Sequence, residues 1–314
     1  MARTALVALV AASLCGCDGD LVNLGASEPL TGGGAGGNAG AGTAGSGVVA
    51  GASLREWLEP QLLFAQDDEL IVSNPTFTEQ GDTLYYTEKP AGDDQLARIY
   101  RRTRLGDTWG DRQALDVGID ASGPAISPSG LELWFGQNVA GGLGETDIWL
   151  SRFQAGAWSA PEHFNEPLNS TSHDAPRPPA VRGTLMPLSS KRHGGPLYQI
   201  YLATRPADDQ PWQDVSSELL ASINSSNFES VDGFLTADGL TLYFSSTRNA
   251  KQQGDLFVAE RSRLLAAFGE PRALVDLNTS GDERDPWLSA DGKQLYFSSN
   301  RGGQYALYSS QHRP

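Results

Sequence analysis

The sequence predicts an all-β protein that forms a single β-propeller, with five blades of four antiparallel strands. Three observations predict this fold. One strand motif recurs five times, a glycine-containing turn precedes it, and the outer strand that the last copy lacks has a counterpart near the N-terminus. The repeated units show alternating rather than helical patterns of apolar residues.

The repeat is clearest in two stretches, "ADGLTLYFSSTR" at 237–248 and "ADGKQLYFSSN" at 290–300. Three more eroded copies align with them, and the copies follow one another at intervals of 49, 53, 56 and 53 residues. A period of this size is typical of propellers and solenoids. The central residues of the five copies are Tyr86, Phe135, Leu188, Phe244 and Phe297.

Each copy contains the signals of a four-stranded blade. An Asp-Gly or Ser-Gly pair precedes the motif in three copies and predicts a hairpin turn with residues at positive φ, and weaker forms of this turn stand at Gly81 and Gly183. The motif itself is apolar on both faces, as expected for a strand with a neighbouring blade on each side. A third strand follows, and the fourth opens with an aromatic residue: Trp109, Trp158, Trp212 and Phe268 in the first four copies.

The last copy ends at Pro314 without a fourth strand, whereas "WLEPQLL" at 57–63 matches the form of one. We therefore expect a propeller over 54–314, in which 54–63 is the outer strand of the last blade and closes the ring. Closure of this kind removes an exposed sheet edge. A sixth blade would need about fifty residues more.

The first residues predict the compartment. An apolar run at 5–14 is too short to span a bilayer and is typical of a signal peptide over 1–16. "LCGC" resembles the lipobox of bacterial lipoproteins, which implies that Cys17 is acylated. A Gly- and Ala-rich stretch over 17–53 would then be a flexible tether. We expect a lipid-anchored protein of the bacterial cell envelope, on the periplasmic or the cell-surface side.

Charge and composition narrow the partners. The formal net charge is −15, and loss of Arg3 with the signal peptide makes it more negative. Such a surface repels phosphates, so we expect no nucleic-acid partner and no membrane contact beyond the lipid anchor. The four histidines show no metal-ligand spacing, and we expect neither a metal site nor a cofactor.

The residues of the repeat resemble those of the PD40, or WD40-like, propeller family of TolB-type periplasmic proteins. "PWLSADGKQLYFSSNRGG" at 286–303 follows that family's pattern closely, and "GFLTADGLTLYFSSTR" at 233–248 nearly so. The resemblance covers about 72–313 and implies a propeller that binds other envelope proteins. TolB-type proteins have six blades and an additional N-terminal domain, and this sequence predicts neither.

Acidic residues cluster just before the expected inner strands, and matched arginines follow the second strands. Because inner strands all run in the same direction beside the axis, these side chains should surround one mouth of the channel. They would form a ring of ion pairs, or bind a ligand such as calcium, or perform acid–base chemistry. The residues are Asp120, Asp174, Glu229, Asp232, Glu283, Asp285, Arg192, Arg248 and Arg301.

Two functions fit the sequence. The first is a non-catalytic envelope lipoprotein whose propeller binds a protein or peptide, and this is the one we expect. The alternative is a carbohydrate-active enzyme, a glycoside hydrolase or lyase, that uses the carboxylates of the channel mouth. The enzyme would need two carboxylates without arginine partners, about 5–9.5 Å apart in a pocket.

Overall fold

A computed structural model describes residues 56–314 except 66, 93–95, 119 and 250–252. The chain divides into two units, 1–52 and 53–314, and all described residues belong to the second. The expected signal peptide, Cys17 and the tether over 17–53 lie outside the described residues. Within the described part of the chain, no helix is long and apolar enough to cross a membrane.

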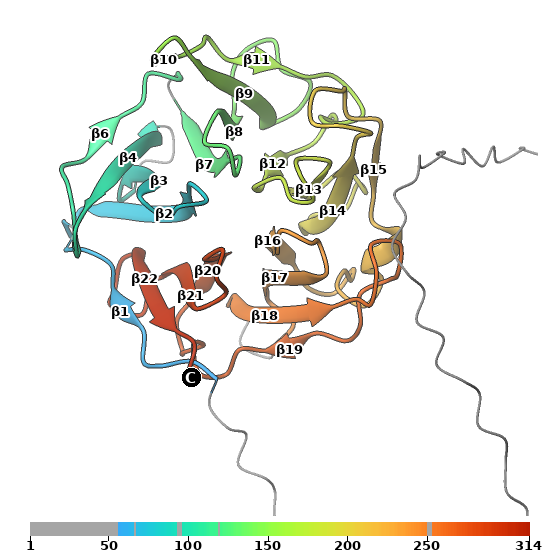
Figure 1. Ribbon diagram of the computed structural model, residues 1–314. Helices are drawn as coiled ribbons and strands as arrows, with labels where there is room; N and C mark the ends of the chain where they lie inside the picture. The colour runs from blue at the N-terminus through green and yellow to red at the C-terminus, as the bar shows by residue number, and fades with distance from the viewer. Residues whose placement is uncertain (1–55, 66, 93–95, 119, 250–252) are drawn as a thin grey trace, which may run out of the picture. The chain divides into compact units, whose positions relative to one another are not determined.

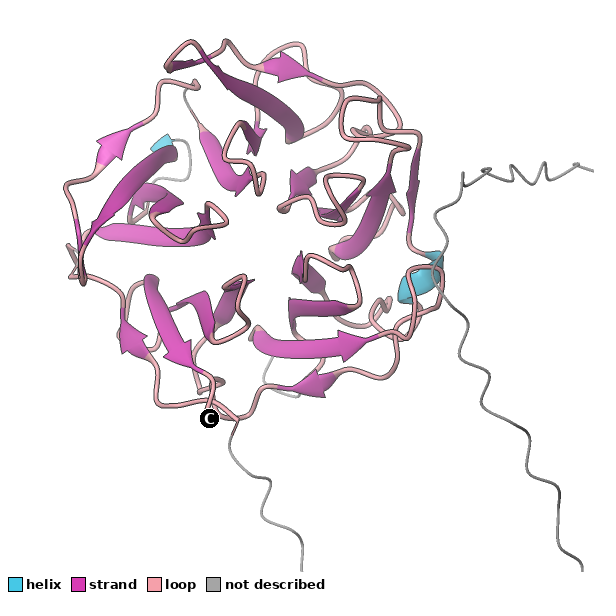
Figure 2. Ribbon diagram, in the orientation of Figure 1, coloured by secondary structure: helices cyan, strands magenta, loops and turns pink. Residues whose placement is uncertain are grey.

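The described unit is a ring of five β-sheets around a central axis (Figures 1 and 2). Each sheet is one blade and is antiparallel throughout. In blades 1 to 4 the strands follow the chain from the axis outward, and in blade 5 the outermost strand comes from the N-terminal segment. The prediction of an all-β propeller with five blades is confirmed. A single 3-10 turn, η2 (Glu218–Leu220), is the longest stretch of helix that the structure describes with bounds.

The strands have the following bounds. Blade 1 contains β2 (Leu70–Phe77), β3 (Thr83–Pro90), β4 (Arg98–Leu105), β5 (Thr108–Trp109) and β6 (Gln113–Ala114). Blade 2 contains β7 (Ala121–Ile126), β8 (Glu132–Gln137), β9 (Asp147–Gln154), β10 (Ala157–Trp158) and β11 (Glu162–His163). Blade 3 contains β12 (Asp174–Pro176), β13 (Leu185–Ser190), β14 (Gln199–Thr204) and β15 (Asp214–Ser216). Blade 4 contains β16 (Ser230–Leu235), β17 (Thr241–Ser246), β18 (Asp255–Glu260) and β19 (Arg272–Ala273). Blade 5 contains β20 (Glu283–Leu288), β21 (Gln294–Ser299), β22 (Ala306–Gln311) and β1 (Gln61–Leu62).

The turns between the first and second strands differ from the expected two-residue form. Only the glycine has a positive φ, which is 70° at both Gly239 and Gly292. The Asp238 carboxylate instead accepts hydrogen bonds from the Leu240 amide, at 3.0 Å, and from the Thr236 hydroxyl, at 2.6 Å. An Asp side chain therefore stabilises a slightly longer turn, and glycine supplies its left-handed position.

The N-terminal strand closes the ring. β1 pairs with β22 as the outermost strand of blade 5, and Trp57 forms a β-bridge with His312. Trp57 is 3% exposed, and its ring lies 5.1 Å from the imidazole of His312, edge to face. The N-terminal and C-terminal strands therefore lie side by side in Figure 1, and the predicted closure is confirmed.

A contact repeated in every blade explains the closure. The next-to-last residue of the third strand, or the residue just past that strand, packs on the aromatic residue near the start of the outer strand. The five pairs are Arg104–Trp109, Phe153–Trp158, Arg205–Trp212, Arg261–Phe268 and His312–Trp57. Trp57 thus has the same place in blade 5 as the aromatic residue of the outer strand has in each of the other blades.

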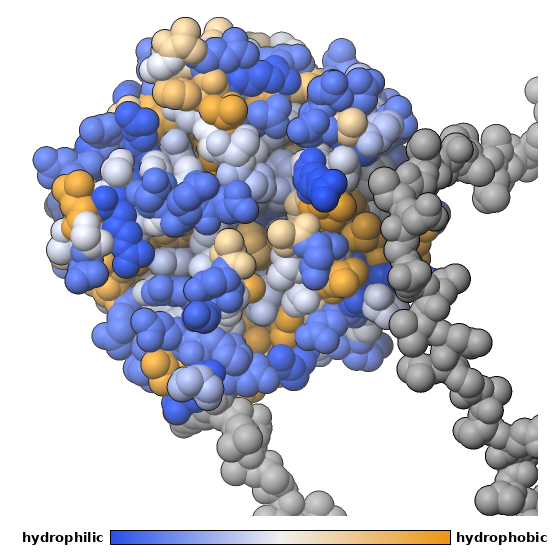
Figure 3. Space-filling view, in the orientation of Figure 1, coloured by the Kyte–Doolittle hydropathy of each residue, from blue (hydrophilic) through white to orange (hydrophobic). Residues whose placement is uncertain are grey.

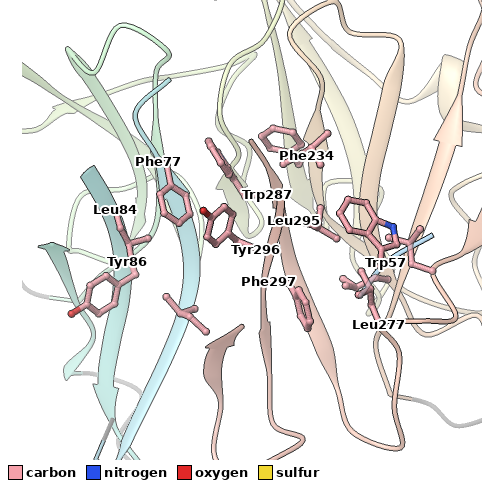
Figure 4. Close-up of a cluster of buried hydrophobic side chains, with 14 of the residues drawn as sticks. Trp57, Phe77, Leu84, Tyr86, Phe234, Leu277, Trp287, Leu295, Tyr296 and Phe297 are labelled. Carbon is pink, nitrogen blue, oxygen red and sulfur yellow. The ribbon is translucent and has the colours of Figure 1, made fainter. Parts of the chain in front are cut away.

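The cores between blades are filled from both sheets. One cluster joins blades 4, 5 and 1 and includes Phe77, Phe234, Trp287 and Tyr296 (Figure 4). The ring of Phe77 lies 4.6 Å from that of Trp287 and 4.2 Å from that of Tyr296. These side chains are large because neighbouring blades diverge away from the axis and leave a wedge to fill.

Candidate functional site

The carboxylates singled out in the sequence lie where the inner strands begin. Asp174 is the first residue of β12 and Glu283 the first of β20, and both are fully buried. Glu229 immediately precedes β16, and Asp120 immediately precedes β7 with a φ of 59°. Asp174 and Glu283 each pair with the last residue of the second strand in their own blade. The residue that pairs with this position is Ser230 in blade 4 and Ala121 in blade 2.

Two of these carboxylates form ion pairs with the arginines of their own blades. Arg192 Nη2 lies 2.7 Å from Asp174 Oδ1, and Arg301 Nη2 lies 3.4 Å from Glu283 Oε1. Hydroxyl and amide groups use the remaining lone pairs. Asp174 accepts from the amide and hydroxyl of Ser170. Glu283 accepts from the amide and hydroxyl of Thr279 and from the hydroxyl of Ser299. Both carboxylates therefore have several hydrogen-bond donors inside the blade.

The third expected pair, Glu229 with Arg248, has a different arrangement. Arg248 Nη2 donates to the Ile223 carbonyl at 2.6 Å and approaches the Ser230 hydroxyl at 3.4 Å. Burial without an adjacent carboxylate lowers the pKa of Arg248 to about 10. Glu229 accepts a long hydrogen bond, 3.4 Å, from the Tyr198 amide. Arg192 and Arg301 make the same carbonyl contact, with Leu168 and Leu277. Blade 4 has Ser230 where blades 3 and 5 have the carboxylate, so Arg248 keeps the carbonyl contact without the ion pair.

A second polar cluster lies midway along the axis, at a bulge of the inner strands. Asp285 accepts hydrogen bonds from the Asn74 side chain at 2.6 Å, the Asn74 amide at 3.1 Å and the Ser298 hydroxyl at 2.7 Å. Arg177 of blade 3 reaches Asp285 of blade 5 with 3.3 Å between Nη1 and Oδ1. Asn74, Asp232 and Asp285 share a left-handed φ of 56–57° at this bulge.

The sequence pointed to Asp232 and Asp285 but missed Asn74 and Arg177. Asn74 has the same place in its blade as the two aspartates, so a stricter alignment of the first copy would have found it. Arg177 lies in the eroded third copy, where β12 is only three residues long. No repeat position predicts a side chain that crosses the axis to another blade.

Asp232 has an unusual protonation equilibrium. Burial, and to a lesser extent the neighbouring charge of Asp285, raises the pKa of its carboxyl to about 7. The guanidinium groups of Arg177 and Arg284 act in the opposite sense. Asp232 therefore exchanges a proton near neutral pH. Its neighbour Asp285 accepts several hydrogen bonds.

The other end of the axis is apolar. A cavity of about 320 Å³ opens at the face that carries the turns between first and second strands, and all five blades line it. Figure 3 shows this face, where hydrophobic surface lies at the centre of the ring between hydrophilic side chains. Its walls include Phe77, Ile126, Phe234, Trp287 and Leu288. The channel thus has a polar middle and one apolar mouth.

Within the part of the chain that the structure describes, no group of three or more His, Cys, Asp or Glu side chains is arranged to hold a metal ion. The acidic residues of the axis are instead interleaved with arginine, asparagine and hydroxyl groups.

Comparisons with known proteins locate the chain by its fold. No family model matches the sequence, and no curated protein matches it. A solved structure described as a glycoside hydrolase is 11% identical with a TM-score of 0.54, over 82% of this chain and 92% of that one. A protein of unknown function from Dyadobacter fermentans is 11% identical with a TM-score of 0.51, over 82% and 99%. A putative TolB from Agrobacterium tumefaciens is 16% identical with a TM-score of 0.49, over 78% of each chain. At these identities the similarity shows the β-propeller fold and nothing finer.

Proposed function

We propose that this chain is a non-catalytic, lipid-anchored envelope protein whose propeller binds a protein or peptide. The observation that carries the proposal is the state of the axial carboxylates. Asp174, Glu283 and Asp285 each accept hydrogen bonds from several groups of their own chain, an arginine among them. Side chains held in this way fix the inner ends of the blades and make a rigid platform.

The envelope part of the proposal rests on the N-terminal residues. An apolar run followed by "LCGC" is the pattern of an acylated cysteine at Cys17, and the Gly- and Ala-rich stretch after it would hold the ring a short distance from the bilayer. The resemblance of the repeats to PD40 sequences of TolB-type proteins supports the same compartment and a binding role.

A second candidate, glycoside hydrolysis, is favoured by one observation. Asp232 with a pKa of about 7 beside Asp285 resembles the combination of a general acid and a carboxylate that many glycosidases use. Against it, both oxygens of Asp285 accept hydrogen bonds at 2.6–2.7 Å, which leaves the second carboxylate poorly placed as nucleophile or base.

One experiment separates the two. The full chain in detergent is used both to select binders from a random peptide library on phage and in reducing-sugar assays on a panel of polysaccharides. We expect reproducible enrichment of peptides and no sugar release. Sugar release that disappears in Asp232→Asn would overturn the proposal in favour of the hydrolase. Absence of any enriched peptide would also contradict it.

A further inference from the structure

The apolar cavity at the turn face continues into a second hollow. A groove of about 520 Å³ lies between blades 5 and 1, where the ring closes. The cavity and the groove share Glu79, Trp287, Ser289, Ala290 and Asp291, so Trp287 forms a wall of both. The cavity and the groove therefore adjoin each other at these shared residues.

The blades line the cavity with different positions of their inner strands. Phe234 and Trp287 occupy one position in blades 4 and 5, where the pairing with the second strand places Thr76 and Ala125 in blades 1 and 2. Blades 1 and 2 line the cavity with the next residues, Phe77 and Ile126. The result is a hollow with an aromatic wall, of a volume at the lower end of the range for ligand cavities. It suits one bulky side chain.

The charges at the border between the two hollows have one sign. Among the residues that the structure describes, Glu79 and Asp291 are the charged ones that line the axial cavity, and both also line the groove. Arg104 and Lys293 line the groove but not the cavity, and Lys293 Nζ lies 3.9 Å from Asp291 Oδ2 in an exposed, weak ion pair. A ligand that crosses the border would therefore gain from a positive charge there, while a second positive charge farther along would be repelled.

We propose that the turn face binds an extended peptide segment that inserts a bulky apolar side chain into the axial cavity and places one lysine or arginine between Glu79 and Asp291. This inference rests on the proposed function and adds to it the binding site and the class of sequence recognised. The apolar side chain supplies affinity by burial against Phe77, Phe234 and Trp287, and the basic side chain supplies selectivity.

The test uses peptides selected from the random library on the full chain in detergent, synthesised and measured by isothermal titration calorimetry. Ala290 is an exposed turn residue at the border, and Ala290→Trp should fill the entrance and weaken binding by more than about tenfold. Ala237→Trp should narrow the same cavity from blade 4, so the test does not depend on the folding of a single variant. Ala267→Trp is the matched control, because Ala267 is exposed and lines neither hollow.

Charge recognition is tested separately. Glu79→Lys should weaken the same peptides by roughly fivefold and abolish the preference for a basic residue beside the apolar one. Glu59→Lys makes an identical change in net charge on the exposed closing segment and should leave binding unchanged. Peptides that bind the parent and both tryptophan variants equally would overturn the proposed site, yet would leave the proposed function intact. Cavity-dependent peptides with no basic preference would overturn the charge rule, and failure to enrich any peptide would count against the proposed function itself.

Discussion

Replacing Asp232 by asparagine should stabilise the protein at high pH and have little effect at low pH. The pKa of Asp232 is raised from 3.8 to about 7 by burial and by the charge of Asp285. Between about pH 4 and pH 7 the folded chain therefore holds a proton that the unfolded chain has released. The free energy of unfolding must fall as pH rises through this window, and the lost stability is not regained above it. Asparagine cannot ionise, so the variant avoids that loss.

The magnitude follows from the size of the shift. A change of about three pKa units corresponds to roughly 4 kcal/mol, since each unit is worth about 1.4 kcal/mol. That figure is a ceiling, because Asp232 is only partly shielded from water in the channel and lies near Arg177 and Arg284. We expect the variant to be more stable than the parent by about 1–3 kcal/mol at pH 8.5, and by only about a third of that amount at pH 5, which lies about a third of the way through the window.

Urea unfolding of parent and Asp232→Asn at the two pH values measures the difference. Glu59→Gln, an exposed carboxylate on the closing segment, serves as control and should show no pH-dependent gain. In Asp285→Asn the pKa of Asp232 should move back toward its ordinary value, and the decline of stability between pH 4 and pH 7 should flatten. Equal effects of Asp232→Asn at pH 5 and pH 8.5, or a loss of stability at pH 8.5, would refute the reasoning.

Three further results are expected. Trp57→Ala should lower stability by about 3–5 kcal/mol in thermal unfolding, because it removes the aromatic residue that seals the last blade; a midpoint equal to the parent's would contradict closure as a source of stability. Asp174→Asn and Glu283→Gln should each cost about 3 kcal/mol, because a partly buried guanidinium loses its carboxylate partner, whereas Glu229→Gln should cost under about 1 kcal/mol. Calcium should leave the parent's thermal midpoint unchanged, and a calcium-dependent rise would restore the ligand interpretation. Cys17→Ser should move the protein from the membrane to the soluble fraction of a bacterial host, and unchanged fractionation would argue against the lipid anchor.

The fold could be predicted because every blade repeats the same local signals. A glycine turn, a strand that is apolar on both faces and an aromatic residue at the start of the outer strand recur at one spacing, and each has a direct physical cause. Closure was predictable for the same reason, since Trp57 matches Trp212 and its equivalents in the contact that it makes. Repetition turns weak single signals into a consistent pattern.

The axial cluster could be predicted only in part, because it depends on contacts between blades. The repeat indicates which residues face the axis but does not indicate which of them meet. Arg177 approaches Asp285 across 108 positions of sequence, and no spacing within the repeat indicates that contact. Within a blade the repeat is more informative. Arg248 donates to the Ile223 carbonyl as Arg192 does to that of Leu168 and Arg301 to that of Leu277, and Ser230 stands where the other two blades have the carboxylate.

The positions where the blades differ therefore say more about function than the positions where they agree. Five equivalent blades would give a symmetric axis with no preferred direction for a ligand. Here the bulge position carries Asn74 in blade 1, Gly123 in blade 2, and Asp232 and Asp285 in blades 4 and 5. Two positions farther along, the same two blades carry the large aromatic rings that line the cavity. Charge and aromatic surface are thus concentrated on one side of the axis, beside the closing seam, and a ligand that binds there would meet both in a fixed orientation.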